Sequence, residues 1–474
     1  MHHQDSARNT PARGRGLEPD SMPRPSYTRS GCSTVDSATR LAGRPGIEVI
    51  ARDRDAPCAD LRPEREVIGP ADMSGASNSH AGDPNPGAPI RVFVHLAYGF
   101  GAWTWEERWQ SGKLLGVNER YPYGYFRAGE YGCDITYSTD VPETKVGKIL
   151  RLGIRVLLGC DLVHAWRNRR GIREADVVWT HTESQFLSVL LLLQPTPRAK
   201  RPNIIAQSVW LFDRWSRLSP IRRWFYSKLL RQADLLTFLS PENLKRARTL
   251  FPQSRAELVL FGINTENVVV PERREAQPRV RVVALGNDEH RDWKTLIDAV
   301  GRMDASCELR IVSRRIDRKL ARGLANVTIV RPRDNEELLS LYAWADILVM
   351  PTQPNLHASG ITVIQEGVLR GVPVICSDTG GLRAYFSENE VCYVPPQDPE
   401  ALRQAIIQLA KNADERWAMA KRAQAHMGPA GLSSHAYARR HAQLSRELVD
   451  GRTGGGALSR PGGPDGSGVR RRLA

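Results

Sequence analysis

The stretch ADILVMPTQPNLHASGITVIQEGVLRGVPVICSDTGG, residues 345–381, decides the fold that this sequence predicts. One short apolar run in it ends at Met350, a second covers residues 372–376, and a helix-like segment that begins near Ser359 separates the two. Short apolar runs on either side of a helix indicate parallel strands that are covered on both faces. Ligands of such sheets bind beyond the carboxyl ends of the strands, so the loops that follow these two runs are the first places to look for a site.

The same pattern repeats on both sides of the polar stretch PERREAQPR, residues 271–279. The runs before it are RVFVHLAYGFG, ADVVWTHTE, NIIAQSVW, ADLLTFLSPENLKRA and AELVLFGIN, and those after it include VRVVALGN, CELRIVSRR, NVTIVRPR and VCYVPP. Apolar runs that alternate with helices predict an α/β chain with two Rossmann-like, doubly wound parallel sheets that face each other across a cleft.

We expect five segments along the chain: a disordered N-terminal tail (1–88), a first Rossmann-like domain (89–271), a second one (272–427), a C-terminal helix (428–450) and a disordered C-terminal tail (451–474). Both tails are rich in Gly and Pro without a hydrophobic period, which is typical of flexible sequence. The first tail lacks the apolar core of a secretory signal, and sequence upstream of the true start is an equal interpretation of it. Ser240-Pro241 and Asp398-Pro399 are expected helix starts.

Composition excludes several classes of protein. The most apolar stretch, residues 186–193, is far shorter than the roughly 20 residues of a membrane-spanning helix. Seven cysteines without a C-x-x-C pair suggest neither a zinc site nor a disulfide framework, and they favour a reducing, cytoplasmic location. The 67 Lys and Arg against 52 Asp and Glu give a net charge of +15. No nucleic-acid-binding motif accompanies this charge, so an anionic membrane or a phosphorylated ligand explains it better.

The helix that begins after Ser359 is the strongest candidate site. Its free N–H groups and dipole suit a diphosphate, Gly360 lets the backbone approach it, and Ser359 and Thr362 add hydroxyl donors. Glu366, almost two turns further on, is placed to accept hydrogen bonds from a ribose diol. The spacing predicts a nucleoside-diphosphate cradle, and the competing interpretation is an ordinary crossover in which the glycines serve packing.

This segment resembles the C-terminal domain of GT-B glycosyltransferases, in particular the retaining group with two glutamates separated by seven residues. Glu366, the run Gly371-Val372-Pro373-Val374 and the turn Gly380-Gly381 match, while Gly360 falls one position earlier than the family's glycine. The first glutamate would fall at Ala358, where this chain has no carboxylate. The resemblance implies a GT-B fold, a nucleotide-sugar donor bound by the second domain, and an acceptor bound by the first. It also implies that the C-terminal helix (428–450) bridges back to the first domain.

A second match is VVALGNDEHRDWKTLIDAV, which resembles the first strand of the family's second domain with its glycine (Gly286) and a basic residue that reaches the diphosphate. Arg291 and Lys294 are the candidates for that cation. Because a cation there stabilises the charge that develops on a UDP or GDP leaving group, the resemblance implies transfer without a metal and without another cofactor. The competing interpretation places both side chains on a solvated helix face.

Three residues are candidates for the catalytic base in the first domain. Asp213 has the best position by analogy with inverting GT-B enzymes, and Glu183 and His181 are second choices. The loop with Gly99 and Gly101 resembles the family's glycine-rich first loop, which lies near the acceptor. The C-terminal motif favours retention at the anomeric carbon, whereas the missing glutamate and Asp213 favour inversion.

Two parts of the first domain combine basic and aromatic residues: residues 148–155 with 166–170, and residues 214–217 with 222–228. This combination suits the interface of an anionic membrane. The whole pattern predicts a peripheral membrane glycosyltransferase of polysaccharide biosynthesis that moves a sugar from a UDP- or GDP-sugar to a lipid-linked (polyprenyl) or polysaccharide acceptor. The alternatives are a sugar-nucleotide epimerase on the same fold and a catalytically silent scaffold.

Overall fold

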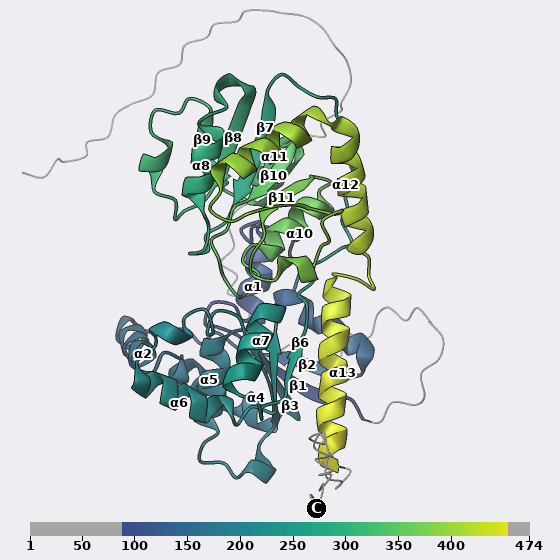
Figure 1. Cartoon of the computed structure of the whole chain (residues 1–474). Coiled ribbons are helices and arrows are strands. Elements are labelled where there is room, and N and C mark those ends of the chain that lie inside the picture. The colour runs from purple at the N-terminus through teal and green to yellow at the C-terminus, as the bar shows by residue number, and fades with distance from the viewer. Residues whose placement is uncertain (1–87, 454–474) are drawn as a thin grey trace, which may run out of the picture. The chain divides into compact units, whose positions relative to one another are not determined.

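The computed structural model describes residues 88–453 (Figure 1). Within this range the strands form two six-stranded sheets, with the orders β2-β1-β3-β4-β5-β6 and β12-β11-β10-β7-β8-β9. Every strand pair in both sheets is parallel. The prediction of two doubly wound parallel sheets is therefore confirmed. The predicted boundary at 271/272 falls between the last strand of the first sheet and the first strand of the second.

The first sheet consists of β1 (Ile90–His95), β2 (Cys133–Tyr137), β3 (Val177–Thr180), β4 (Asn203–Ser208), β5 (Leu235–Phe238) and β6 (Ala256–Leu258). The second consists of β7 (Val280–Leu285), β8 (Cys307–Val312), β9 (Val327–Val330), β10 (Ile347–Met350), β11 (Val374–Ser377) and β12 (Cys392–Val394). The sequence pattern identified each of them except β2, an edge strand in which four of the five residues are partly or fully exposed.

The helices of the first half are α1 (Ala102–Gln110), α2 (Lys145–Leu158), α3 (Leu162–Arg167), α4 (Arg169–Glu174), α5 (Glu183–Leu192), α6 (Pro220–Leu230) and α7 (Pro241–Leu250), with a 3-10 segment η2 (Pro122–Tyr131). Those of the second half are α8 (Trp293–Val300), α9 (Asn335–Trp344), α10 (Ile361–Leu369), α11 (Pro399–Lys411), α12 (Ala413–His426) and α13 (Ser434–Thr453). The expected helix starts are confirmed, because the side chains of Ser240 and Asp398 accept hydrogen bonds from the first turns of α7 and α11.

Successive side chains of the strands in the first sheet point alternately into two hydrophobic cores, one on each face of the sheet. Val92 and Val94 of β1 face a core that α13 also enters, whereas Phe93 faces the core under α5 and α6. Successive side chains of a strand point to opposite faces, and here both faces are apolar, which explains the continuous apolar runs. The first of these cores continues into the second sheet, where it includes Leu285 and Leu348. The two sheets are thus joined by buried apolar contacts.

The last helix differs from the prediction at both of its ends. We expected a helix over residues 428–450, but α13 begins at Ser434 and continues through Thr453, three residues into the expected tail. The residues before Ser434 form a turn in which Gly431 N–H donates to Gly428 O. The other residues of the two expected tails lie outside the described part of the chain. All five cysteines of residues 88–453 are free, and no helix in this range has the length and apolarity to cross a membrane.

Candidate functional site

The loops that follow β7 and β10 are joined at the carboxyl edge of the second sheet. β10 pairs with β7 on one side and with β11 on the other, so the three strands end side by side. An antiparallel bridge between Arg291 and Thr352, flanked by backbone hydrogen bonds, ties the loop of residues 286–292 to the loop of residues 351–360. This bridge brings the basic residue of the first loop next to the start of α10.

Arg291 is buried at this point, with 8% of its surface exposed. Its Nη1 donates to Ser359 Oγ (2.7 Å) and its Nε donates to the carbonyl of Leu285 (3.1 Å). Burial lowers the pKa of Arg291 to about 10, so the guanidinium is still charged at neutral pH. Gly286 makes this packing possible, because it has a φ of +140° and a Cβ on it would overlap Nε of Arg291.

The loop before α10 is folded by a single asparagine. Asn355 Oδ1 accepts hydrogen bonds from the backbone N–H groups of His357 (3.2 Å) and Ser359 (3.1 Å). Gly360 caps α10 with a φ of +93°, a conformation that favours glycine. The turn after β11 packs beneath this loop, since a Cβ on Gly380 would overlap Asn355 Oδ1. The matching Gly-Gly turn therefore supports the shape of the loop that presents the helix start.

Glu366 is fully engaged by other groups of the protein. Its Oε2 accepts a hydrogen bond from Tyr342 Oη (2.7 Å), and its Oε1 accepts one from the backbone N–H of Val117 (3.1 Å), in the first half of the chain. Burial raises the pKa of Glu366, although these two hydrogen bonds oppose that shift. Glu366 and Thr362 both line a cavity next to this contact. The carboxylate thus points toward the first half of the chain and forms no ion pair with the residues described.

Asp213 reaches the same loop from the first half. Its Oδ1 accepts the backbone N–H of Leu356 (2.6 Å) and its Oδ2 lies 3.0 Å from His357 Nδ1. The other ring nitrogen of His357 lies 3.1 Å from Asp288 Oδ2. Burial opposes a charge on this imidazole, but the hydrogen bonds to the two carboxylates outweigh it and raise the pKa of His357 to about 9. The histidine is therefore a cation held between two aspartates.

The same cluster offers the ligands of a metal ion when His357 is neutral, since a protonated imidazole has no free nitrogen lone pair. Asp288, His290 and His357 each have a ligand atom within 4.8 Å of the other two. Imidazole and carboxylate are common ligands of divalent transition metals. From the sequence we predict transfer without a metal, and this stays a prediction.

The structure separates the two candidate cations. Arg291 lies beside Ser359, whereas Lys294 lies on the exposed face of α8 and pairs with Asp298 (2.5 Å) one turn away. Lys294 does not belong to the group of residues at the start of α10. The alternative interpretation, a solvated helix face, applies to Lys294 and not to Arg291.

The second-choice bases have structural contacts. Glu183 Oε1 accepts backbone hydrogen bonds from Val209 (2.7 Å) and Leu211 (2.6 Å), so it shapes the loop after β4. His181 is buried, lies 2.9 Å from Tyr125 Oη through Nδ1, and stacks on Tyr123 with ring centres 3.6 Å apart. Burial lowers the pKa of His181 to about 3, so the ring is neutral at physiological pH.

The glycine-rich loop of the first half is closed by an acidic side chain. The N–H groups of Gly99 and Gly101 donate to the two oxygens of Asp140 (2.9 and 3.0 Å). Gly99 has a φ of +89° with open space around its Cα, whereas a Cβ on Gly101 would press against Asp140. In this arrangement the loop amides bind the protein's own carboxylate.

Four residues of the site were not identified from the sequence: Asn355, Asp288, Tyr342 and Gly116. Asp288 stands directly after an apolar run, in LGNDEH, so its position at a strand end was a usable signal. Tyr342 and Gly116 lie against Glu366 but are distant from it in the sequence. No local sequence pattern predicts such contacts. His357, next to Ala358, is likewise not among the residues predicted from the sequence.

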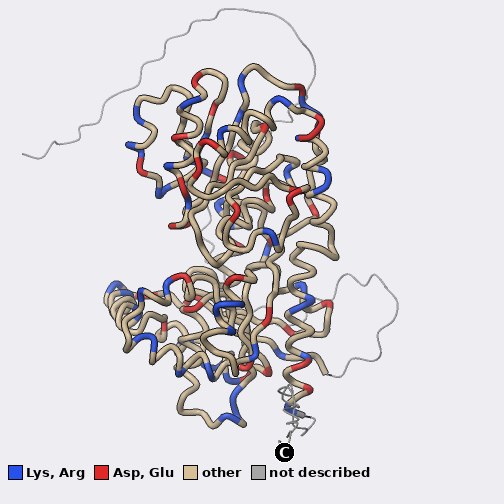
Figure 2. The backbone as a smooth tube through the Cα atoms, in the orientation of Figure 1, with Lys and Arg blue, Asp and Glu red and all other residues tan. Residues whose placement is uncertain are grey.

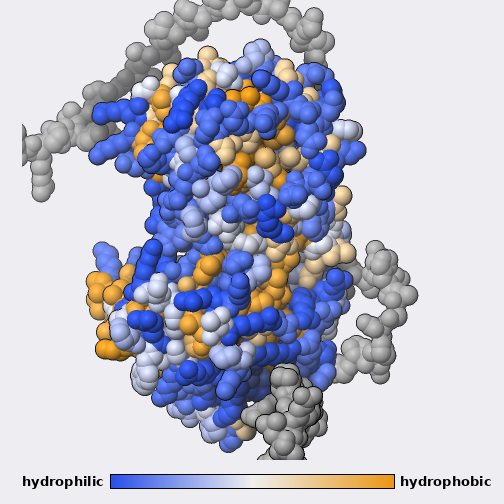
Figure 3. Space-filling model, viewed as in Figure 1, coloured by the Kyte–Doolittle hydropathy of each residue, from blue (hydrophilic) through white to orange (hydrophobic). Residues whose placement is uncertain are grey.

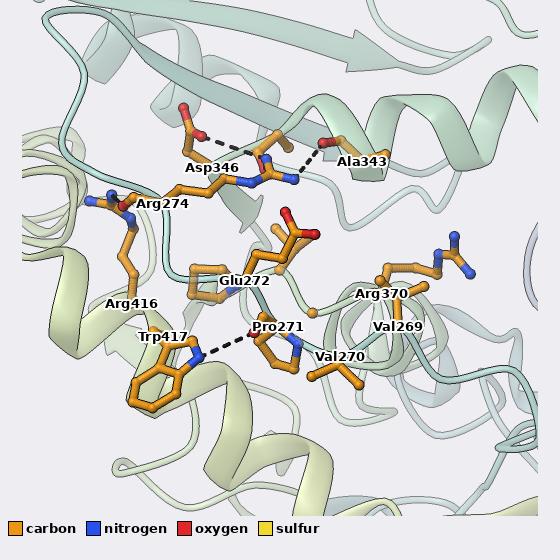
Figure 4. Close-up of a pocket in the computed structure, with 14 residues that line it drawn as sticks. Val269, Val270, Pro271, Glu272, Arg274, Ala343, Asp346, Arg370, Arg416 and Trp417 are labelled. Atoms are coloured by element: carbon orange, nitrogen blue, oxygen red, sulfur yellow. Dashed lines mark hydrogen bonds and ion pairs between the residues drawn. The ribbon is translucent and has the colours of Figure 1, made fainter.

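Two cavities other than the one beside Glu366 lie at different ends of the strands. One, lined by Pro271, Arg274, Asp346 and Trp417 among others, is shown in Figure 4. Asp346 directly precedes β10, so this cavity lies at the amino end of that strand, opposite the candidate site. The other is lined by Glu183, Trp210 and Asp288 with several arginines, and these residues follow strands β3, β4 and β7. The second cavity therefore has the position expected for a ligand.

Comparison with known proteins identifies the second half of the chain. Residues 279–412 match the family described as Glycosyl transferases group 1. Over 101 residues the chain is 38% identical to D-inositol 3-phosphate glycosyltransferase of Corynebacterium urealyticum. The aligned residues make up 21% of this chain and 23% of that protein. It is 23% identical to the D-rhamnosyltransferase WbpZ of Pseudomonas aeruginosa (53% of this chain, 68% of the relative) and 25% identical to O-antigen chain mannosyltransferase C of Escherichia coli (50% and 67%).

Solved structures share the fold of both halves. Sucrose-phosphate synthase from Thermosynechococcus elongatus aligns with a TM-score of 0.57 at 16% identity, over 76% of this chain and 100% of that one. Anabaena HepE in complex with UDP-glucose aligns with a TM-score of 0.52 at 13% identity, over 76% and 99%. At these identities the likeness establishes the fold alone. Residues 279–412 are thus similar to the group 1 glycosyltransferases, and the two halves together share the fold of these solved structures.

Proposed function

We propose that this protein transfers a sugar from a UDP- or GDP-sugar to a hydroxyl group of a lipid-linked or polysaccharide acceptor, and that the transfer needs no metal on the diphosphate. The observation that carries the proposal is the buried, charged Arg291 bonded to Ser359 at the start of α10. A cation and a helix N-terminus that face one point favour a diphosphate. They also stabilise the negative charge that a departing nucleoside diphosphate develops.

Glu366 would hold the ribose of the donor nucleoside. Its two oxygens now accept from Tyr342 Oη and the Val117 N–H, and a ribose diol presents the same kind of donor. Donor binding at Glu366 then requires the loop around Val117 to give up its hydrogen bond. We therefore propose that this loop moves when the donor binds.

Asp213 is our candidate for the group that accepts the proton of the acceptor hydroxyl. It contacts the donor-side loop through Leu356 and His357, so it lies next to the place where we put the diphosphate. Both of its oxygens have partners in this arrangement, and one of them must be released before it acts as a base.

The relatives support the choice of substrates. HepE has been crystallised with UDP-glucose, and two relatives are named for the transfer of rhamnose and for an O-antigen chain. A nucleoside-diphosphate hexose and a saccharide acceptor are the corresponding proposals here. An enzyme of this kind would work at the cytoplasmic face of the membrane that carries its acceptor.

A panel of nucleotide sugars tests the proposal. Any donor that binds the folded protein raises its apparent stability, so thermal unfolding in the presence of each UDP- and GDP-sugar selects the donor. The selected donor is then incubated with saccharide acceptors, and the products are analysed by mass. A gain in acceptor mass equal to one sugar is expected. Isomerised donor without transfer would establish the epimerase, and no stabilisation by any nucleotide would establish the silent scaffold.

A further inference from the structure

Helices α2 and α6 contain no Asp or Glu. Their sequences are KVGKILRLGIRVLL (Lys145–Leu158) and PIRRWFYSKLL (Pro220–Leu230). Several large apolar side chains on them are exposed, which is costly for a surface that only meets water. We define the α2–α6 face by the most exposed of these: Val146, Ile149, Leu150, Val156, Leu157, Ile221 and Trp224, with exposed fractions between 61% and 78%.

The exposed residues of α2 follow the period of a helix. Val146, Ile149, Leu150 and Leu157 are spaced by three, four and seven residues and so lie on one side of the helix. The opposite side is anchored by Arg151, which is buried and pairs with Glu143 and Asp161. The ion pairs of Arg151 thus fix the inner side of α2 against the protein, and the apolar stripe on its other side faces outward.

The two helices form one continuous surface. Arg222 Nη2 donates to the carbonyl of Val156 (2.9 Å), and Tyr226 Oη donates to the carbonyl of Leu158 (3.1 Å). These bonds hold the start of α6, where Ile221 lies, against the end of α2. Figure 3 shows hydrophobic side chains gathered over α2.

Basic side chains accompany this face. Lys145, Lys148 and Arg155 of α2 and Lys228 of α6 are exposed, and Lys228 Nζ lies 5.8 Å from the ring centre of Trp224. Figure 2 shows blue segments of the tube along this part of the chain. We propose that the α2–α6 face binds the surface of an anionic lipid bilayer. Apolar side chains would enter the acyl boundary while the cations meet the headgroups. A second copy of this chain is a poorer occupant, because two such faces would oppose like charges.

The basic and aromatic stretches of the sequence predict a membrane surface in this region, and the structure changes which residues would form it. Trp215, within the basic stretch 214–217, is 6% exposed and packs against Phe212 and Phe251. Arg151 is in the buried anchor. Most of the face consists of aliphatic residues of α2, which a pattern of basic and aromatic residues does not reveal.

The position of the face bears on the acceptor, and this step rests on the proposed function. Arg155, Arg222 and Tyr226 line the cavity that Trp210 and Asp288 also line. The face and the strand-end cavity are therefore continuous. A saccharide carried on a membrane lipid would reach the cavity from this side, with arginines near its phosphate groups.

Co-sedimentation of the full chain with vesicles tests the proposal. The wild type is expected to bind vesicles that contain about one third phosphatidylglycerol and to bind pure phosphatidylcholine at least tenfold more weakly. Replacing any one of the accompanying cations Lys145, Lys148, Arg155 or Lys228 with Gln should weaken binding about fivefold. Raising the salt concentration should weaken it further. The double variant Ile149→Asp/Leu157→Asp should lose binding, while Val270→Asp, at a site equally exposed outside the face (76%), should retain it.

Three results would overturn the proposal. The first is that the wild type fails to bind anionic vesicles at low salt, and the second is that the double variant binds them equally well. The third is that the wild type is a dimer while the double variant is a monomer. Far-ultraviolet circular dichroism shows whether the double variant is folded. Nucleotide binding, measured without vesicles, separates this proposal from the proposed function, since the double variant should keep its affinity for the donor. Loss of vesicle binding with donor binding intact supports the membrane face by itself.

Discussion

Arg291 and Lys294 lie three residues apart and carry the same charge, yet only Arg291 contacts the start of α10. Arg291 is buried between Leu285 and Ser359, whereas Lys294 pairs with Asp298 on a solvated helix face. The distinction comes from Gly286, whose missing side chain leaves room for the guanidinium. The position of this guanidinium is therefore set by Arg291 and its immediate neighbours.

Replacing Arg291 with Met should weaken UDP or GDP binding about tenfold to a hundredfold, because a hydrogen bond to a charged group contributes about 1.5–3 kcal/mol. Isothermal titration measures the affinity. Lys294→Met is the matched control and should leave the affinity within twofold of the wild type. A larger loss in Lys294→Met than in Arg291→Met would reverse the assignment.

Because of His357, we expect the free energy of unfolding to fall as the pH becomes alkaline. Its pKa is raised from 6.5 to about 9, so its charged form contributes stability in full below pH 6.5 and loses that contribution as the pH rises through 9. The contribution is at most about 3 kcal/mol. Urea unfolding between these pH values should show the decline in the wild type, and His357→Gln should flatten it. An unchanged slope in His357→Gln would show that other groups cause the decline.

At the scale of elements, local patterns in the sequence were sufficient for the strands and several helix starts. Apolar runs predict buried parallel strands, and Ser240 and Asp398 cap helices through bonds to residues two or three positions away. β2 was missed because, as an edge strand, it is only partly buried. The contacts of Glu366 were not predictable, because its partners Tyr342 and Val117 are distant in sequence and are brought together by packing.

The loop around Gly116 is the element that closes over Glu366. Gly116 has a φ of +105°, and a Cβ on it would overlap Glu366 Oε1. Gly116→Ala should therefore lower the unfolding free energy by clearly more than the roughly 1 kcal/mol of a left-handed alanine alone. Gly112→Ala is the control for conformation, since Gly112 has a φ of +66° with nothing within 4 Å of its added Cβ. Equal losses in urea unfolding would mean that the contact with Glu366 adds nothing.

At the scale of the whole molecule, α13 ties the end of the described chain to the first sheet. Trp179 Nε1 donates to Ser445 Oγ (2.9 Å), and Tyr437 contacts Tyr125 and Gln207. The core that these residues enter also contains residues of the second sheet. The expectation of a returning helix came from the family resemblance, whereas its contacts follow from the buried aromatic residues.

Tyr437→Ala should lower the unfolding free energy of the described fold by about 3–5 kcal/mol, because it removes a fully buried aromatic ring from the shared core. Arg439→Ala, two positions away on the exposed side of α13, should change it by less than about 0.5 kcal/mol. Chemical denaturation gives both values. Similar effects of the two variants would show that α13 does not stabilise the core.

The central claim is that Arg291 and the start of α10 hold a diphosphate while Glu366 holds the adjoining ribose. Its most direct test is calorimetric titration of UDP, GDP and their 2′-deoxy forms into the wild type, Glu366→Gln and the exposed control Glu336→Gln. The wild type and Glu336→Gln should bind one ribonucleotide at least tenfold more tightly than its deoxy form, and Glu366→Gln should lose that preference. A Glu366→Gln protein that keeps both the affinity and the preference would contradict the claim.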